Sequence, residues 1–164
     1  GAAGYTMPLP ENDDMFITKG KMLQDIMVSL GGRIAEEIIF GDITTGASSD
    51  IKKATKAARD MVTRYGMSEN IGVINYNSDD DEVFIGRDLA HAKSHSELIS
   101  GEIDREVKKI IDDCYSKAKA IILEHMEVLH NCAQELLKKE KIGREEFEAL
   151  FDQKDASPEA FFNE

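Results

Sequence analysis

Residues 44–65, TTGASSDIKKATKAARDMVTRY, form a short run of small residues followed by a pattern typical of a helix. Apolar or small side chains recur there every three or four residues, which is the spacing of one helix face. We predict a helix that begins near residues 48–50 and ends before Gly66, a natural C-terminal stop. The small residues on its stripe allow a neighbouring helix to come close. The stripe consists of Ile51, Ala54, Ala58, Met61, Val62 and Tyr65.

Asp50 lies in the first turn of this predicted helix, in line with Ala54, Ala57 and Met61 at the edge of the buried face. A negative charge is stabilised at a helix N-terminus. Asp is also common as a capping residue, and from spacing alone capping is the more frequent explanation. The other interpretation is that Asp50 is one ligand of a metal site.

The preceding segment predicts a helix from an N-cap at Thr18 to about Phe40. Its main apolar stripe is followed by a second apolar face from Val28 onward, and a helix that is apolar nearly all round is usually internal. Gly31 and Gly32 in its middle lower helix propensity but permit close approach of another backbone. The main stripe is Leu23, Ile26, Met27, Leu30, Ile34 and Ile38; the second face adds Ala35 and Ile39.

Two adjacent carboxylates, Glu36 and Glu37, fall in the stretch that is apolar on both faces. A buried carboxylate needs a partner. Arg33 is three residues before one and four before the other, so it can pair with either. We expect the remaining glutamate to need another cation, a histidine N–H or water.

The fold class is predicted as mainly α, with a small β portion. Short strands are expected at Tyr5–Leu9, GVINY (72–76) and EVFIG (82–86). The acidic run NSDDD (77–81) between the last two is interpreted as a solvated hairpin tip, because it lacks the spacing of a calcium-binding EF-hand loop.

The C-terminal half predicts three helices: one long helix over about residues 98–122, a second from Met126 to Leu137, and a short third in REEFEALF (144–151). Helices of this kind joined by tight turns pack as an antiparallel bundle. The tail after Asp152 is expected to be disordered.

Composition excludes several classes of partner. The chain has 164 residues and a net charge of −12, which argues for one domain and against binding to nucleic acid or an anionic membrane surface. No apolar run approaches the length of a bilayer span, and the opening GAAGYTMPLP reads as a piece of a longer protein. Cys114 and Cys132 are expected to be buried free thiols, with a disulfide or a zinc pair as the less favoured alternative.

Several familiar catalytic motifs fail here. His91 and His95 have i, i+4 spacing, but Ala92 stands where a zinc-peptidase helix has its glutamate. His125 and His130 are five residues apart, a poor spacing for shared ligation. Gly20-Lys21 does not complete a nucleotide-binding loop, and no motif supports Ser/His/Asp catalysis.

Three segments together resemble one family. GYTMPLP (4–10), SLGGRIAEEIIFGDITTGASSDIKKATKAARDMVTRYGMSENIG (29–72) and EVFIGRD (82–88) are similar, in order and spacing, to the peptidase domain of the FtsH family of membrane-anchored, ATP-dependent zinc proteases. The similarity is strongest over residues 4–88, and the helical remainder is compatible with that domain's C-terminal helices.

The resemblance implies a zinc site completed elsewhere. In the family two histidines of an HExxH helix and a downstream aspartate bind zinc, and the glutamate of that motif is the base. The aspartate matches Asp50, whereas the HExxH helix is expected upstream of residue 1, so the chain itself holds no catalytic residue. Glu36 matches a position near the zinc site, and it is a candidate acceptor for the free N–H of a ligating histidine. Residues 1–90 would be the zinc-site portion, 91–152 the C-terminal helices and 153–164 a tail.

The resemblance also implies the function and assembly of the parent protein. It would form a hexamer anchored in the cell membrane, with the peptidase domain on the cytoplasmic side, and would unfold and cleave polypeptides with ATP and magnesium in a separate module. Alone, this chain is expected to be inactive, to hold no stoichiometric zinc and to form a monomer or loose oligomer. The rival interpretation is a non-enzymatic helical interaction module.

Overall fold

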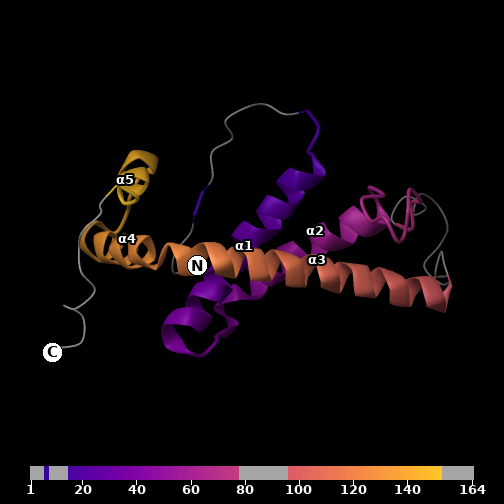
Figure 1. Cartoon of the computed structure of the whole chain (residues 1–164), viewed down its shortest axis with the longest axis horizontal. Coiled ribbons are helices and arrows are strands. Elements are labelled where there is room, and N and C mark those ends of the chain that lie inside the picture. The colour runs from indigo at the N-terminus through magenta and orange to yellow at the C-terminus, as the bar shows by residue number, and fades with distance from the viewer. Residues whose placement is uncertain (1–5, 8–14, 78–95, 153–164) are drawn as a thin grey trace, which may run out of the picture.

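The computed structural model describes residues 6–7, 15–77 and 96–152. In these segments the order of elements is α1 (Lys19–Phe40), a 3-10 turn η1 (Thr45–Ala47), α2 (Ser48–Thr63), α3 (Glu97–Glu124), α4 (Met126–Lys139) and α5 (Arg144–Ala149). All five α-helices were predicted from the sequence. Figure 1 shows α3 as a long rod that α1 and α2 both pack against.

Local signals explain where α1 begins and ends. The Thr18 side chain accepts a hydrogen bond from the backbone N–H of Lys21 at 3.2 Å, which confirms the predicted N-cap. Gly41 ends the helix in the left-handed conformation, with φ of 62°, and its N–H binds the carbonyl of Glu37. The chain therefore reverses immediately after Phe40 and enters η1 and α2.

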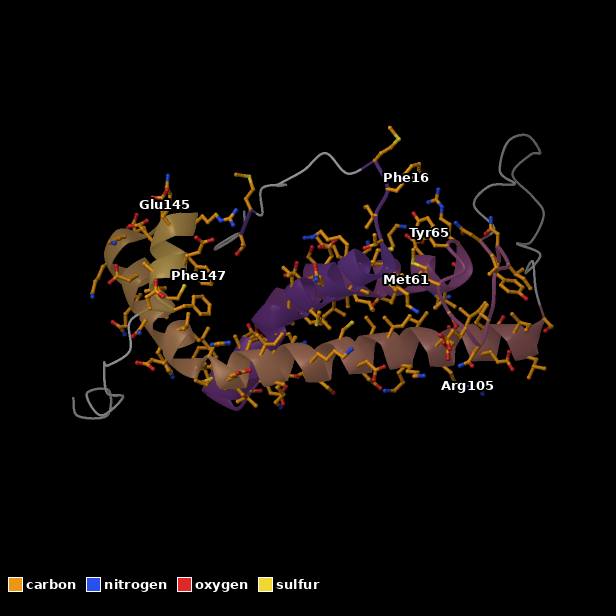
Figure 2. The ribbon with its side chains drawn as sticks, turned by 45° about the horizontal axis from the view of Figure 1, so that its top comes forward. Phe16, Met61, Tyr65, Arg105, Glu145 and Phe147 are labelled. Atoms are coloured by element: carbon orange, nitrogen blue, oxygen red, sulfur yellow. The ribbon has the colours of Figure 1, made fainter. Side chains whose placement is uncertain are left out.

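The core lies where α1, α2 and α3 meet. Met61 lies between the α1–α2 pair and α3, whereas Arg105 points away on the opposite side of α3 (Figure 2). The predicted alanines Ala54 and Ala58 are both buried, so α2 can approach its neighbours closely. The other buried members of the core are Ile26, Leu30, Ile34, Val62, Ile71, Ile103, Val107, Cys114 and Ala118.

One face of α1 differs from the prediction. The side chains of Val28 and Ile39 are 69% and 42% exposed, so α1 is not internal on all sides. A Cβ built at Gly31 or Gly32 would meet no heavy atom within 4 Å. Within the described segments no neighbouring element fills the space that these two glycines leave.

The described residues contain no β-strand, so the strand predicted at GVINY (72–76) is wrong. Gly66 and Gly72 both have positive φ, and they bend the segment back on the end of α2. The N–H of Tyr76 binds the carbonyl of Thr63 at 2.7 Å instead of a partner strand. The other two predicted strands, the acidic tip and the tail after Asp152 lie wholly or mostly outside the described residues.

The C-terminal helices are present, but their packing as an antiparallel bundle is not confirmed. The principal partners of α3 are α1 and α2, and its contact with α4 is slight. His125 interrupts the helix between α3 and α4 and stacks edge-on against Phe151, with ring centroids 5.4 Å apart. As Figure 1 shows, α4 and α5 form a corner at one end of α3.

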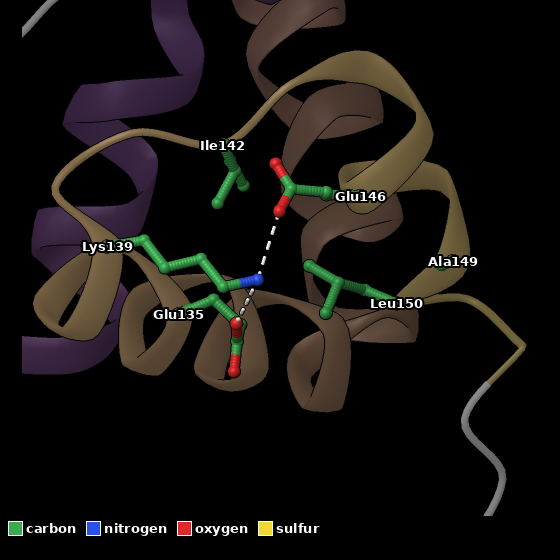
Figure 3. A pocket seen from close by; sticks show the side chains of 6 residues that line it. All are labelled: Glu135, Lys139, Ile142, Glu146, Ala149 and Leu150. Carbon is green, nitrogen blue, oxygen red and sulfur yellow. Dashed lines mark hydrogen bonds and ion pairs between the residues drawn. The ribbon is translucent and has the colours of Figure 1, made fainter.

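An ion-paired pocket of 220 Å³ lies in this corner. The Nζ of Lys139 lies 3.0 Å from a carboxylate oxygen of Glu135 and 3.0 Å from one of Glu146, as Figure 3 shows. These contacts raise the pKa of Lys139 and lower the pKa of Glu135. The N–H of Gly143, and after it Lys139, lowers the pKa of Glu146. The arrangement fixes the turn between α4 and α5, with the N–H of Gly143 also bound to Glu146.

None of the helices in the described segments has the length and apolarity that crossing a bilayer requires.

Candidate functional site

Asp50 is the third residue of α2, and its side chain is 45% exposed. The N-cap of the helix is Ala47, which makes no side-chain capping bond. The charge of Asp50 is therefore favourable in the first turn without Asp50 being the N-cap residue. Within the described residues the carboxylate has one partner, the Nζ of Lys53 at 3.3 Å from Oδ1. An ion pair this exposed is weak.

The turn before α2 is tight. The N–H of Gly46 donates to the hydroxyl oxygen of Thr44 at 3.1 Å, which closes the turn on itself. A Cβ at Gly46 would lie 3.2 Å from that hydroxyl oxygen, closer than side chains ordinarily pack. The buried Ala47 follows and anchors the turn. Asp50 thus projects from a helix whose start is fixed by the turn on one side and by buried alanines on the other.

Glu36 lies against this turn. Its Oε1 accepts a hydrogen bond from the Thr44 hydroxyl at 2.8 Å, and its Oε2 accepts one from the Thr44 backbone N–H at 3.3 Å. The structure therefore joins two of the sequence-derived features, Glu36 and the turn that leads to Asp50. The sequence does contain a hint of this bond, because the threonine-rich turn follows the C-terminus of α1 closely.

Glu37 faces the other way, toward α3. It accepts a hydrogen bond from the Tyr115 hydroxyl and pairs with the Nζ of Lys119 at 2.9 Å. The predicted pairing with Arg33 is not what the structure shows: the partners of the two glutamates are Thr44, Tyr115 and Lys119, and Nη1 of Arg33 is buried without a hydrogen-bond partner. Tertiary partners on α3 and in the turn displace the local i, i+3 and i, i+4 pairs.

An exposed stripe runs along α1, on the side away from Glu37 and α3. Val28, Gly32, Ala35 and Ile39 are spaced by four, three and four residues, which places them on one helix face. Gly32 is exposed and Ala35 is half-buried. Small residues between two larger apolar ones make a shallow apolar surface that a second helix could pack against. We call these four residues the open face of α1.

Within the described segments no histidine or cysteine joins Asp50 in a group of three that could hold a metal. His91 and His95 lie outside the described residues. His125 lies between α3 and α4, His130 lies within α4, and both are exposed. Both cysteines are free thiols, with Cys114 buried and Cys132 half-buried, and burial raises the pKa of each. A raised thiol pKa lowers the fraction of the reactive thiolate at neutral pH.

A larger cavity of 490 Å³ lies between the start of α1, α3 and the loop after α2. Its wall includes Glu106, whose carboxylate accepts hydrogen bonds of 2.6 Å from both Ser68 and Asn70. These bonds, Ser68 first, lower the pKa of Glu106, and Lys109 and Lys19 contribute to the same effect. Glu106 therefore holds the loop after α2 against α3, and it is distant in sequence from Asp50.

No group of three His, Cys, Asp or Glu side chains able to hold a metal occurs within residues 6–7, 15–77 and 96–152. A catalytic zinc takes three protein ligands and keeps one position open for water. Asp50 suits one such ligand, since its carboxylate is accessible and its one partner in the described part of the chain is an exposed lysine. The other ligands of such a site would have to come from elsewhere.

Comparison with known proteins gives consistent matches. The family model for peptidase family M41 matches residues 1–150. The chain is 49% identical over 158 residues to the ATP-dependent zinc metalloprotease FtsH of Caldicellulosiruptor bescii, covering 96% of this chain and 26% of that protein. It is 45% identical over 152 residues to the FtsH of Bacillus subtilis, covering 92% of this chain and 24% of that protein. The chain therefore spans about a quarter of the length of the curated relatives it matches.

Proposed function

The chain belongs to peptidase family M41, and from this membership we propose that it forms part of the catalytic domain of an ATP-dependent zinc endopeptidase. Relatives that match over more than nine-tenths of this chain carry that description. The activity belongs to a longer protein, because the chain corresponds to a quarter of each relative.

Asp50 is the zinc ligand that this chain contributes. The observation that carries this assignment is its accessible carboxylate on the first turn of a helix fixed by the buried Ala54 and Ala58. A ligand held on a rigid element keeps its geometry while the open coordination position exchanges water and substrate. Bound zinc supplies a polarised water for attack on a peptide carbonyl.

The open face of α1 supports a facing helix that brings the two histidine ligands. Val28 and Ile39 are exposed apolar side chains, and Gly32 between them leaves room for another backbone. The turn containing Thr44 and Gly46 joins the end of α1 to the start of α2. A helix seated on this face would lie on α1, the helix that carries Glu36 and that the turn joins to Asp50 at the start of α2.

The rest of the machinery lies outside this chain. We infer an ATPase module with bound magnesium, membrane anchoring by other segments with the peptidase domain on the cytoplasmic side, and a homohexamer that takes unfolded polypeptides as substrates. The printed names of the relatives support the dependence on ATP, and the other assignments rest on the resemblance to the family alone.

The decisive experiment is Asp50→Asn in the full-length protein that contains this chain. We expect loss of bound zinc and of casein degradation, because the substitution removes an anionic oxygen, while the rate of ATP hydrolysis is retained. Asp25→Asn is the matched control, since Asp25 is also an exposed carboxylate paired with one lysine, Lys21 at 2.7 Å. Degradation at the wild-type rate with zinc retained in Asp50→Asn would show that Asp50 is not a ligand.

The isolated chain provides a second test. With one ligand, it should neither hold one zinc per chain at neutral pH nor degrade casein. Metal analysis of the purified 164-residue chain measures the first point directly. One tightly bound zinc per chain would contradict the proposal that the other ligands lie outside it.

A further inference from the structure

Both oxygens of Glu36 are engaged by a single residue. The Thr44 hydroxyl donates to Oε1 at 2.8 Å and the Thr44 N–H donates to Oε2 at 3.3 Å. The two residues are eight positions apart, on either side of the left-handed Gly41. The carboxylate therefore closes the connection between α1 and η1 in the manner of a clasp.

The Thr44 hydroxyl also binds the next part of the turn, at Gly46. While it donates to Glu36, the same oxygen accepts the N–H of Gly46 at 3.1 Å. The oxygen of Glu36 would also lie 3.6 Å from a Cβ at Gly46, so the carboxylate, the hydroxyl and the glycine pack as one unit. Ala47 is buried directly after this unit, and Asp50 follows three residues later.

The end of α1 that carries Glu36 is itself bound to α3. The neighbouring Glu37 joins the same turn of α1 to Tyr115 and Lys119 on α3. Glu36 and Glu37 thus divide two tasks: Glu37 fixes the end of α1 to α3, and Glu36 holds the turn relative to α1. The position of the start of α2 therefore depends on both glutamates.

We propose that Glu36 is a positioning residue that fixes the direction of Asp50 through Thr44. This inference rests on the assignment of Asp50 as a zinc ligand. It differs from a role in which Glu36 itself binds a ligating histidine, because here Glu36 acts on Asp50 through Thr44. It predicts that substitution of Glu36 and substitution of Thr44 have the same effect, and that combining them adds nothing further.

The first experiment measures the clasp without metal or activity. Amide hydrogen exchange of Thr44, Gly46 and Ala47 is followed by NMR in the 164-residue chain and in the variants Glu36→Gln, Thr44→Val and the double variant. Because the turn is exposed and water competes for its groups, we expect exchange to quicken about three- to tenfold. The double variant should be no faster than either single one.

Two further variants test the specificity of the effect. Thr44→Ser keeps the hydroxyl and should restore slow exchange of the Gly46 amide. Glu37→Gln lies next to Glu36 but contacts α3, so it should leave the turn amides unchanged. Additive effects in the double variant, or an unchanged turn in Glu36→Gln, would overturn the clasp.

The second experiment measures zinc affinity of the full-length protein by competition with a chelator. We expect Glu36→Gln and Thr44→Val each to weaken binding about 10- to 100-fold, as losses of supporting groups around a metal site do, with no further loss in the double variant. Thr44→Ser should bind zinc normally. If Glu36→Gln weakens binding while Thr44→Val does not, Glu36 acts directly on another ligand and the inference is wrong.

The two hypotheses fail differently. Should Asp50→Asn keep its zinc, the assignment of the ligand is wrong whatever the exchange data show. Should Asp50→Asn lose zinc while Thr44→Val binds it normally, Asp50 is a ligand that Thr44 does not position.

Discussion

Lys119 on α3 pairs with Glu37 on α1, with its Nζ 2.9 Å from Oε1 of the carboxylate. Tyr115, one turn earlier on α3, donates its hydroxyl to the other oxygen of the same group. The side chains of Lys119 and Glu37 are 36% and 39% exposed, so water screens the charge pair in part. The carboxylate nevertheless joins two helices that are 82 residues apart in sequence at this point.

Glu37→Ala removes both contacts, and we expect it to lower the free energy of unfolding by roughly 1–2 kcal/mol. Tyr115→Phe removes only the hydroxyl bond and should cost about 1 kcal/mol. Urea denaturation of the two variants and of their combination measures the coupling. If the two effects simply add, the hydroxyl and the carboxylate do not stabilise each other and the described contact is unimportant.

The pH dependence of stability should contain a contribution from Glu106. Hydrogen bonds from Ser68 and Asn70 lower the pKa of this carboxyl in the folded chain below its ordinary value of 4.5. The contribution is therefore fully present above pH 4.5 and is lost as the pH falls through the lower folded value. Glu106→Gln should be less stable than wild type by about 1 kcal/mol at neutral pH.

The difference between the two proteins should shrink as the pH falls below 4.5, because a protonated Glu106 then resembles glutamine. Denaturant unfolding at a series of pH values provides the measurement. Comparison with the variant cancels the titration of the other carboxylates. A difference that stays constant from pH 7 to pH 3 would contradict the proposed role of the ionised form.

Close packing of α2 predicts that Ala58→Leu destabilises the chain. Ala58 is fully buried among the core residues of α1, α2 and α3, so the larger side chain must displace its neighbours. We expect a loss of about 1–3 kcal/mol. Lys52→Leu, at an exposed position of the same helix, should change stability by less than about 0.5 kcal/mol. Thermal and urea unfolding followed by circular dichroism compare the two.

The helices could be predicted because their signals are local. Thr18, Gly41 and Gly66 mark boundaries by capping and backbone conformation, and the apolar spacing of α2 identifies Ala54 and Ala58 as buried. These features depend on residues within one or two turns of each other. The same argument places Asp50 at the start of α2, but it does not assign its role.

The remaining features depend on contacts that a linear pattern does not contain. Glu37 binds Tyr115, which is 78 residues away in sequence. The short separation between Glu37 and Arg33 therefore did not identify the partner of Glu37. GVINY contains the valine, isoleucine and tyrosine that favour strands, yet Gly72 has a φ of 80° and Tyr76 bonds to the end of α2. The second apolar face of α1 was recognised correctly as apolar, but the sequence pattern could not show that this face is exposed.

The open face of α1 leads to a prediction with opposite effects on stability and function. Gly32 lies within a helix, where alanine is about 1 kcal/mol more favourable than glycine. A Cβ at this position meets nothing within 4 Å, so Gly32→Ala should stabilise the 164-residue chain by about 0.5–1 kcal/mol. If a helix that carries the zinc-binding histidines is seated here, the same methyl group should obstruct it and lower casein degradation by the full-length protein.

Gly101→Ala is the matched control for this experiment. Gly101 lies within α3 and a Cβ there also meets nothing within 4 Å, so the gain in helix propensity is the same while the open face is untouched. Both variants should raise the unfolding midpoint of the 164-residue chain, but only Gly32→Ala should reduce degradation and zinc retention in the full-length protein. Full degradation by Gly32→Ala would mean that no backbone approaches this glycine, and the facing helix would then have to lie against another part of the chain.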